Sequence, residues 1–192
     1  MSDTITERVE VSRLELIDAG ILAPFYNRLV AGTPFCYPVS EGRFVEGVVA
    51  KSPDHISPER MRESSHHVAS DRLREEHLLV ARRAGEVLGF AHTALEHTDG
   101  ADRGVIRFLG YTPGERAAGQ ELLSRAEGHL CALGVRETVA FEHDYPYPFY
   151  HLALGYLSDR LAHITGLLGV NGYAAVVWPP ETGPSIVRVS RA

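Results

Sequence analysis

The chain has 192 residues, of which 44% are hydrophobic and 23% charged, which suits one ordinary globular domain over residues 1–192. Nineteen basic and 25 acidic residues leave a formal net charge of −6, which argues against nucleic acid as a partner. The longest apolar run, 173–178, is too short for a membrane span, and the acidic N-terminus lacks a signal-peptide pattern, so we expect a cytoplasmic protein without membrane attachment.

The first half of the chain mixes clear and weak patterns. Residues 6–16 alternate as a strand does, and residues 17–30 carry apolar side chains at helical spacing. Pro24 fits that helix only in its first turn. Residues 33–58, with four prolines and two glycines, indicate a functional loop or lid, or a helix that the pattern hides. Residues 57–76 predict a polar helix with a serine N-cap and proline at its first position.

The second half carries the strongest signals. Residues 77–83 and 86–96 are β-rich and are separated by Ala84 and Gly85, which predicts a hairpin. The further elements that we expect are a strand at 105–111, an amphipathic helix from near Gln120 to Gly134, a strand at 137–141, a helix at 158–170, and strands at 174–178 and 186–189. This order predicts an α/β fold with a mixed sheet.

A turn of small residues, 112–119 (TPGERAAG), joins the 105–111 strand to the amphipathic helix. Such a turn leaves several backbone N–H groups unpaired and pointing one way, and the positive end of the helix dipole adds to them. The turn therefore suits a phosphate, to which Arg116 would add a charge-assisted contact. The alternative is an ordinary strand-to-helix turn that uses small residues for packing.

The hairpin, strand, turn and helix together resemble the GNAT superfamily of acyl-CoA N-acyltransferases. In that family a strand and a proline precede Arg/Gln-x-x-Gly-x-Gly/Ala and a leucine pair. Here Gly119 matches the second glycine and Leu122 and Leu123 match the pair, whereas Gly114 and Ala117 replace the Arg/Gln and the first glycine. The resemblance implies an α/β (α+β) fold with a GNAT-like mixed, mostly antiparallel central sheet flanked by helices.

A second segment is similar to the same family. Its members end a later helix with a glycine and an aromatic residue before a strand, as Gly172 and Tyr173 do here. In many members a tyrosine four residues before that glycine protonates the departing thiolate. Leu168 occupies that position in this chain.

The resemblance implies an N-acetyltransferase with acetyl-CoA as cosubstrate and no metal. A primary amine of a small molecule or peptide would attack the thioester directly, without a covalent enzyme intermediate. The pantetheine arm would lie in a gap beside the backbone of Leu109, Gly110 and Tyr111. The phosphates would be held by the N–H groups of the following segment: Glu115, Arg116, Ala117, Ala118, Gly119 and Gln120.

The transfer needs a base for the amine and an acid for the thiolate. Glu142 and His143 follow the 137–141 strand and are candidates for the base, with a solvated strand end as the alternative. Tyr145, Tyr147 and Tyr150 are candidates for the acid, with a rigid loop or a dimer contact as the alternative.

Two further side chains share a face of the hairpin. His92 and Glu96 stand at alternate positions, and a half-exposed sheet face is the favoured interpretation for both. Metal ligands are too scattered for a site, because adjacent histidines diverge and His129 and Cys131 are only two apart.

An alternative function is a catalytically weak or inactive GNAT-fold binding or assembly module, which Leu168, Ala117 and Gly114 favour. Gly119 favours an enzyme, because a module without CoA has no need to keep it. A homodimer is possible, since the strand at 186–189 has the pattern of one that could pair across an interface.

Overall fold

The computed structural model describes residues 8–34, 36–49, 72–97, 102–142, 145, 149, 157–177 and 184–189, with only the backbone described at 175–177 and 184–189. Its elements, in chain order, are β1 (Glu10–Leu14), the 3-10 helix η1 (Leu16–Leu22), α1 (Ala23–Leu29), α2 (Glu41–Val49), β2 (Leu73–Arg83), β3 (Glu86–Glu96), β4 (Arg103–Tyr111), α3 (Arg116–Ala132), β5 (Glu137–Ala140), the 3-10 helix η5 (Asp159–Leu161), α4 (Ala162–Val170), β6 (Ala174–Val177) and β7 (Pro184–Val189). None of the helices in this part of the chain has the length and apolar character needed to cross a membrane.

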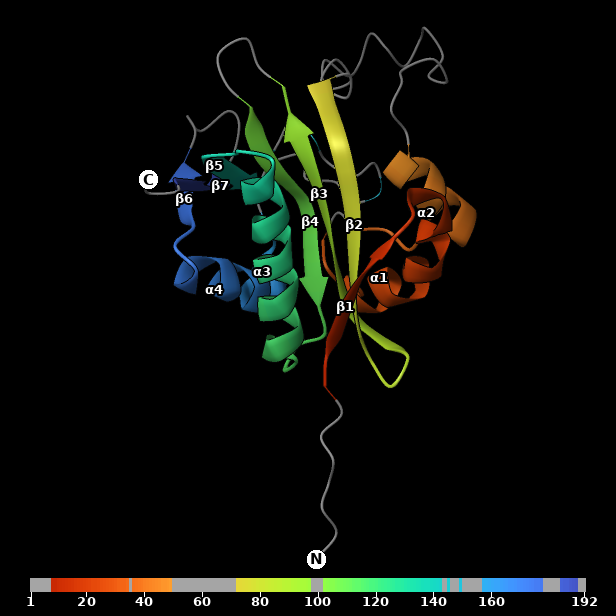
Figure 1. Cartoon of the computed structure of the whole chain (residues 1–192). Helices are drawn as coiled ribbons and strands as arrows, with labels where there is room; N and C mark the ends of the chain where they lie inside the picture. The colour runs from red at the N-terminus through yellow and green to blue at the C-terminus, as the bar shows by residue number, and fades with distance from the viewer. Residues whose placement is uncertain are drawn as a thin grey trace, which may run out of the picture.

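The seven strands form one sheet in the order β1-β2-β3-β4-β5-β7-β6. Only β4 and β5 are parallel, and the other neighbouring pairs are antiparallel. Helices α1 and α2 cover one face of the sheet, and α3 and α4 cover the other (Figure 1). The predicted mixed, mostly antiparallel sheet flanked by helices is confirmed.

The β2–β3 hairpin is confirmed, and its turn explains the sharp reversal. Arg83 pairs with Glu86, so the loop consists of Ala84 and Gly85 alone. Both have positive φ, 49° and 82°, as a type I′ turn requires because its twist matches that of the flanking strands.

The segment that contains α1 and α2 differs from its sequence prediction in two ways. The predicted helix at 17–30 is divided into η1 and α1, and Pro24 lies in the first turn of α1, where its missing N–H is tolerated. The proline-rich 33–58 region contains α2, which is hidden because it has only nine residues and two glycines. Its Phe44 and Val48 are fully buried.

Three predicted boundaries or roles were wrong. Residues 73–76 belong to β2 rather than to a polar helix, because Leu73 and Arg74 pair with β3; the rest of that predicted helix lies outside the described residues. Helix α3 begins at Arg116 rather than near Gln120. The last strand, β7, cannot pair across a dimer as expected, because β5 and β6 already occupy its two edges.

Candidate functional site

The pairing of β4 with β5 stops partway along β4. It covers only Gly104 to Ile106, and a last bond runs from the Phe141 N–H to the Ile106 carbonyl at 2.9 Å. On its other side β4 stays paired with β3 as far as Tyr111. A bulge marks the point of separation, since Arg107 is an extra residue between two consecutive β3–β4 pairs, and bulges bend the strand that contains them. The two parallel strands therefore part just after Ile106.

The three predicted pantetheine-binding residues lie on β4 beyond this point. Leu109 is fully buried, and a Cβ on Gly110 would lie 2.5 Å from Leu29. The Tyr111 hydroxyl donates to the His163 carbonyl at 2.8 Å, and the His163 Nε2 lies 3.0 Å from the Tyr111 carbonyl oxygen. Helix α4 thus contacts the end of β4, and burial raises the pKa of Tyr111.

The turn at 112–119, named here the phosphate turn, opens onto the surface. The N–H groups of Ala118 and Gly119 bond to the Glu115 carbonyl, as in any first helical turn. Within the described part of the chain, the N–H groups of Arg116 and Ala117 donate to no acceptor, and both residues are exposed. No acidic side chain lies in the first turn of α3. These features suit an anion.

Two side chains of this segment have structural partners instead. The Glu115 carboxylate accepts two hydrogen bonds from Arg83, at 2.9 and 2.8 Å. These bonds are the main reason that the pKa of Glu115 is lowered. The Gln120 amide pairs with the Asn171 amide at 2.9 and 3.1 Å, which ties α3 to the end of α4.

Gly119 has a packing reason that its sequence position did not reveal. A Cβ at this position would lie 2.6 Å from the ring of Tyr111, so only glycine fits beneath that ring. The glycine is needed whether or not the chain binds CoA. Its presence therefore does not separate an enzyme from a binding module.

The candidate catalytic residues that the structure describes are buried and paired. The Tyr145 hydroxyl donates to Glu96 at 2.6 Å, and Arg103 lies 2.6 Å from the other oxygen of Glu96 and 3.3 Å from Glu142. Burial first, and then the bond to Glu96, raise the pKa of Tyr145 well above its usual range. His143, Tyr147 and Tyr150 lie outside the described residues.

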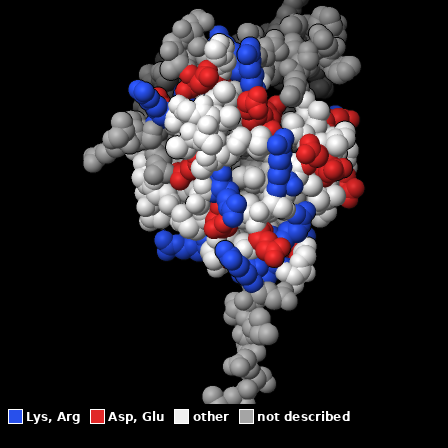
Figure 2. Space-filling view, in the orientation of Figure 1, with Lys and Arg blue, Asp and Glu red and all other residues white. Residues whose placement is uncertain are grey.

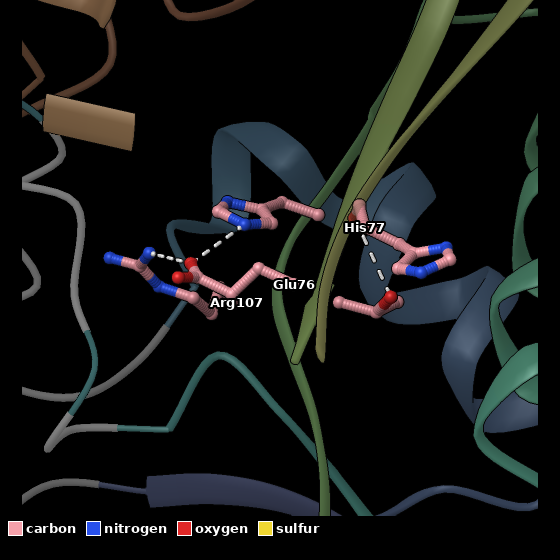
Figure 3. Close-up of polar contacts among 5 residues, drawn as sticks. Glu76, His77 and Arg107 are labelled. Carbon is pink, nitrogen blue, oxygen red and sulfur yellow. Dashed lines mark hydrogen bonds and ion pairs between the residues drawn. The ribbon is translucent and has the colours of Figure 1, made fainter. Parts of the chain in front are cut away.

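A second buried group, which we call the buried network, consists of Glu76, His92 and Arg107, and Figure 3 labels Glu76 and Arg107. His92 Nε2 and Arg107 Nη1 lie 3.1 and 3.0 Å from the same carboxylate oxygen of Glu76. The side chains of His92, Glu76 and Arg107 are 0%, 4% and 8% exposed. The half-exposed face expected for His92 and Glu96 was therefore wrong, because both side chains lie beneath other parts of the chain.

Sequence reasoning missed Glu76 and Arg107. Glu76 was assigned to a polar helix, where a charged side chain needs no explanation. Arg107 carried a usable signal, since it interrupts the apolar run from Val105 to Leu109, and a charge inside a buried strand needs a partner.

Leu168, at the position of the family's tyrosine, is fully buried in α4. Across the residues that are described, no three potential ligands gather into a metal site. On the face shown in Figure 2, basic and acidic side chains are interspersed.

No family model and no curated protein matches the sequence. Solved structures do match the fold. A GCN5-related glucosamine N-acetyltransferase region of a fungal multi-domain beta-N-acetylglucosaminidase has a TM-score of 0.63 and 14% identity, over 90% of this chain and 18% of that one. The putative acetyltransferase yncA from Salmonella typhimurium, solved with acetyl-CoA, has a TM-score of 0.56 and 13% identity, over 96% and 95%.

A third similar structure is the paia N-acetyltransferase from Thermoplasma acidophilum in complex with coenzyme A. Its TM-score is 0.50 at 16% identity, over 95% of this chain and 99% of that one. The chain therefore has the fold of the GNAT-superfamily acyl-CoA N-acyltransferases. At these identities the likeness concerns the fold, and this chain spans less than a fifth of the fungal protein.

Proposed function

We propose that the protein is an acyl-CoA-dependent N-acetyltransferase that transfers an acetyl group from acetyl-CoA to a primary amine of a small molecule or peptide. One observation carries the proposal. The β4–β5 pairing ends at Ile106, and the unpaired edge of β4 leads directly to a helix N-terminus with exposed N–H groups. Such a combination suits a ligand with an extended amide arm and a phosphate at its end.

In this proposal the backbone of Leu109, Gly110 and Tyr111 binds the pantetheine arm. The phosphates are bound at the start of α3, over Glu115, Arg116, Ala117, Ala118, Gly119 and Gln120. The donors are the N–H groups of Arg116 and Ala117, which have no acceptor among the described residues, whereas those of Glu115, Ala118 and Gly119 already bond to backbone carbonyls of this segment. The first turn of α3 lacks acidic side chains, and Arg83 offsets the charge of the N-cap residue Glu115, so the partial positive charge of the helix end is available to the pyrophosphate. Arg116 adds a full positive charge.

The structure favours some catalytic candidates over others. Tyr145 is poorly suited to protonate a thiolate, because its proton is engaged by Glu96 and its pKa is raised. Glu142 shares Arg103 with Glu96, which favours a role in holding Tyr145 over a role as the base. His143, Tyr147 and Tyr150 stay candidates from the sequence.

Calorimetric titration of the purified protein with CoA and acetyl-CoA tests the proposal. The variants are Arg116→Glu and Ala117→Glu, since both positions are exposed and neither substitution disturbs the core. The matched control is Arg136→Glu, an exposed arginine beyond the far end of α3, about 25 Å away at 1.5 Å per residue. We expect micromolar binding that both turn variants weaken at least tenfold and the control leaves unchanged.

Absence of binding up to millimolar CoA would contradict the proposal and favour the alternative, an assembly module that keeps only the fold. Equal weakening by all three glutamate substitutions would indicate a general charge effect and would contradict the phosphate turn as the binding site.

A further inference from the structure

The buried network lies where two irregularities of the sheet meet. In β2, residues 75 and 76 together oppose the single residue Ala94 of β3, and Glu75 has a φ of 49°. In β4, Arg107 is the extra residue of the other bulge. Bulges and positive φ at a non-glycine residue are unfavourable by themselves, and they concentrate where a side chain must point in a particular direction.

A contribution to the stability of the fold does not account for the buried network. A buried ion pair with its hydrogen bonds is often no more stable than apolar residues of similar volume. Here His92 of β3 and Arg107 of β4 converge on one carboxylate oxygen of Glu76 of β2. His92 stands two residues after the fully buried Phe90, on the same face of β3. Such an arrangement is typical of a functional group that must be held at a fixed position.

The network also lies beside the point where β4 and β5 separate. Arg107 directly follows Ile106, the last paired residue, and His92 is the cross-strand partner of Phe108. A thioester arm that follows the free edge of β4 from the phosphate turn reaches this point with its reactive end. The network is therefore at the closed end of the proposed CoA path.

A cavity borders the network at Glu76, on the side of β1 and η1, away from β4 and β5. It has a volume of about 410 Å³ and is lined by Arg13, Leu14, Glu15, Leu16, Ile17, Val49 and Glu76. Four of these seven side chains are apolar, and Glu76 is the member that belongs to the network. A ligand in this cavity would present its polar end to the Glu76 carboxylate and its body to the apolar wall.

We infer that Glu76 and His92 form the proton-transfer pair of the acetyl transfer, that Arg107 positions Glu76, and that the cavity takes a primary amine with an apolar body. The inference rests on the proposed function. It assigns the base to β2 and β3, away from Glu142 and the segment that follows β5.

The protons balance in four steps. The ammonium group of the acceptor gives its first proton to the Glu76–His92 pair, which passes it to water through the cavity, and the neutral nitrogen attacks the thioester carbonyl, which forms the C–N bond. The nitrogen then gives a second proton to the Glu76–His92 pair. The tetrahedral intermediate collapses with cleavage of the C–S bond, and the thiolate takes the proton from the pair. One proton is released to solvent overall, and no tyrosine at position 168 is required.

The test compares Glu76→Gln with its exposed neighbour Glu75→Gln, which keeps the bulge and leaves the buried network intact. Turnover of acetyl-CoA is followed with 2-phenylethylamine and isopentylamine as acceptors, and with ethanolamine as an acceptor without an apolar body. We expect Glu76→Gln to lower kcat at pH 7 by about 100-fold or more. The loss should shrink as the pH approaches the pKa of the amine, because solution then supplies the neutral nitrogen. CoA affinity and the KM for acetyl-CoA should not change.

Removal of one charge from a buried pair can prevent folding, so the charge-balanced double variant Glu76→Gln/Arg107→Gln is measured alongside, with the melting temperature of each protein. The same loss of kcat with normal CoA binding supports the inference.

The inference is overturned if Glu76→Gln is as active as Glu75→Gln, or if its loss of kcat is the same at every pH. A native protein that binds CoA but acetylates neither apolar amine also overturns it, and that result leaves the proposed CoA site intact. Failure to bind CoA overturns both proposals.

Discussion

The phosphate turn and the buried network are built in opposite ways. The turn is eight consecutive residues on the surface, and its chemistry comes from backbone N–H groups at the start of α3. The network draws three side chains from three strands, with Glu76 and Arg107 separated by 31 positions, and it is almost fully buried. A backbone site of the first kind tolerates many side chains, whereas the second kind depends on the identity of each one.

The two regions also differ in what holds them. Around the phosphate turn, the Arg83–Glu115 pair is about 30% exposed, so water and salt screen it. In the buried network the side chains are at most 8% exposed, so a charge that loses its partner stays in a medium of low polarity. Substitutions should therefore have unequal effects in the two regions.

The largest effect is expected for Arg107→Gln, which removes the guanidinium that lies 3.0 Å from the buried Glu76 carboxylate. We expect a decrease of roughly 3–5 kcal/mol in the free energy of unfolding. The control is Arg125→Gln, which breaks an exposed pair with Glu121 and should lower it by no more than about 0.5 kcal/mol. Urea denaturation measures both, and similar values for the two variants would contradict the distinction drawn between the regions.

The next effect concerns Gly119 at the phosphate turn. Gly119→Ala places a Cβ 2.6 Å from the Tyr111 ring and should destabilise the protein by about 1–3 kcal/mol. Gly128→Ala, in the same helix with no atom within 4 Å, should stabilise it by about 0.5–1 kcal/mol. If packing is the reason for the glycine, Tyr111→Ala should remove most of the penalty at position 119. A penalty that persists in that background would show that another neighbour requires the glycine.

The third effect is the pH dependence of stability, and it concerns His77. This residue lies on the face of the sheet opposite to Glu76 (Figure 3). The His77 ring stacks on the His129 ring with centroids 3.6 Å apart. Burial first, and then His129 and Arg13, lower the pKa of His77 below its usual 6.5. The unfolded chain therefore binds a proton more readily, and this part of the stability is present above pH 6.5 and is lost as the pH falls below it.

The measurement is the urea midpoint between pH 7.5 and pH 5. We expect His77→Gln to flatten this profile, whereas Arg43→Gln, at an exposed arginine that stays charged throughout this range, should keep its slope. An identical slope in the native protein and His77→Gln would exclude His77 as the source.

The smallest effect is expected for Glu115→Gln. This change removes a negative charge beside the phosphate turn and releases Arg83. CoA affinity should rise by roughly twofold to fivefold at low salt and by less at high salt. Titration calorimetry at two salt concentrations checks this expectation, and a decrease in affinity would indicate that the Arg83–Glu115 pair holds the turn in its binding shape.

Much of the fold was predictable because its signals are local. The β2–β3 hairpin follows from Ala84 and Gly85 between two β-rich runs, and α3 follows from apolar residues at a helical spacing. Helix α2 was hidden because nine residues with two glycines give a weak pattern, although Phe44 and Val48 bury its apolar face. Residues 73–76 became strand because pairing with β3 outweighs the helical preference of a polar segment.

The sequence by itself determined the order of the elements from β2 onward, the turn that leads into α3 and the resemblance to the GNAT superfamily, because each depends on residues close together in the chain. The tertiary structure alone decided where β4 leaves β5, why Gly119 must be glycine, and which charges meet at Glu76. Those features depend on strand register and on two bulges, and a shift of one residue in register would turn every side chain of a strand to the other face. No short segment of the sequence contains that information, because register is fixed by packing between residues far apart in the chain.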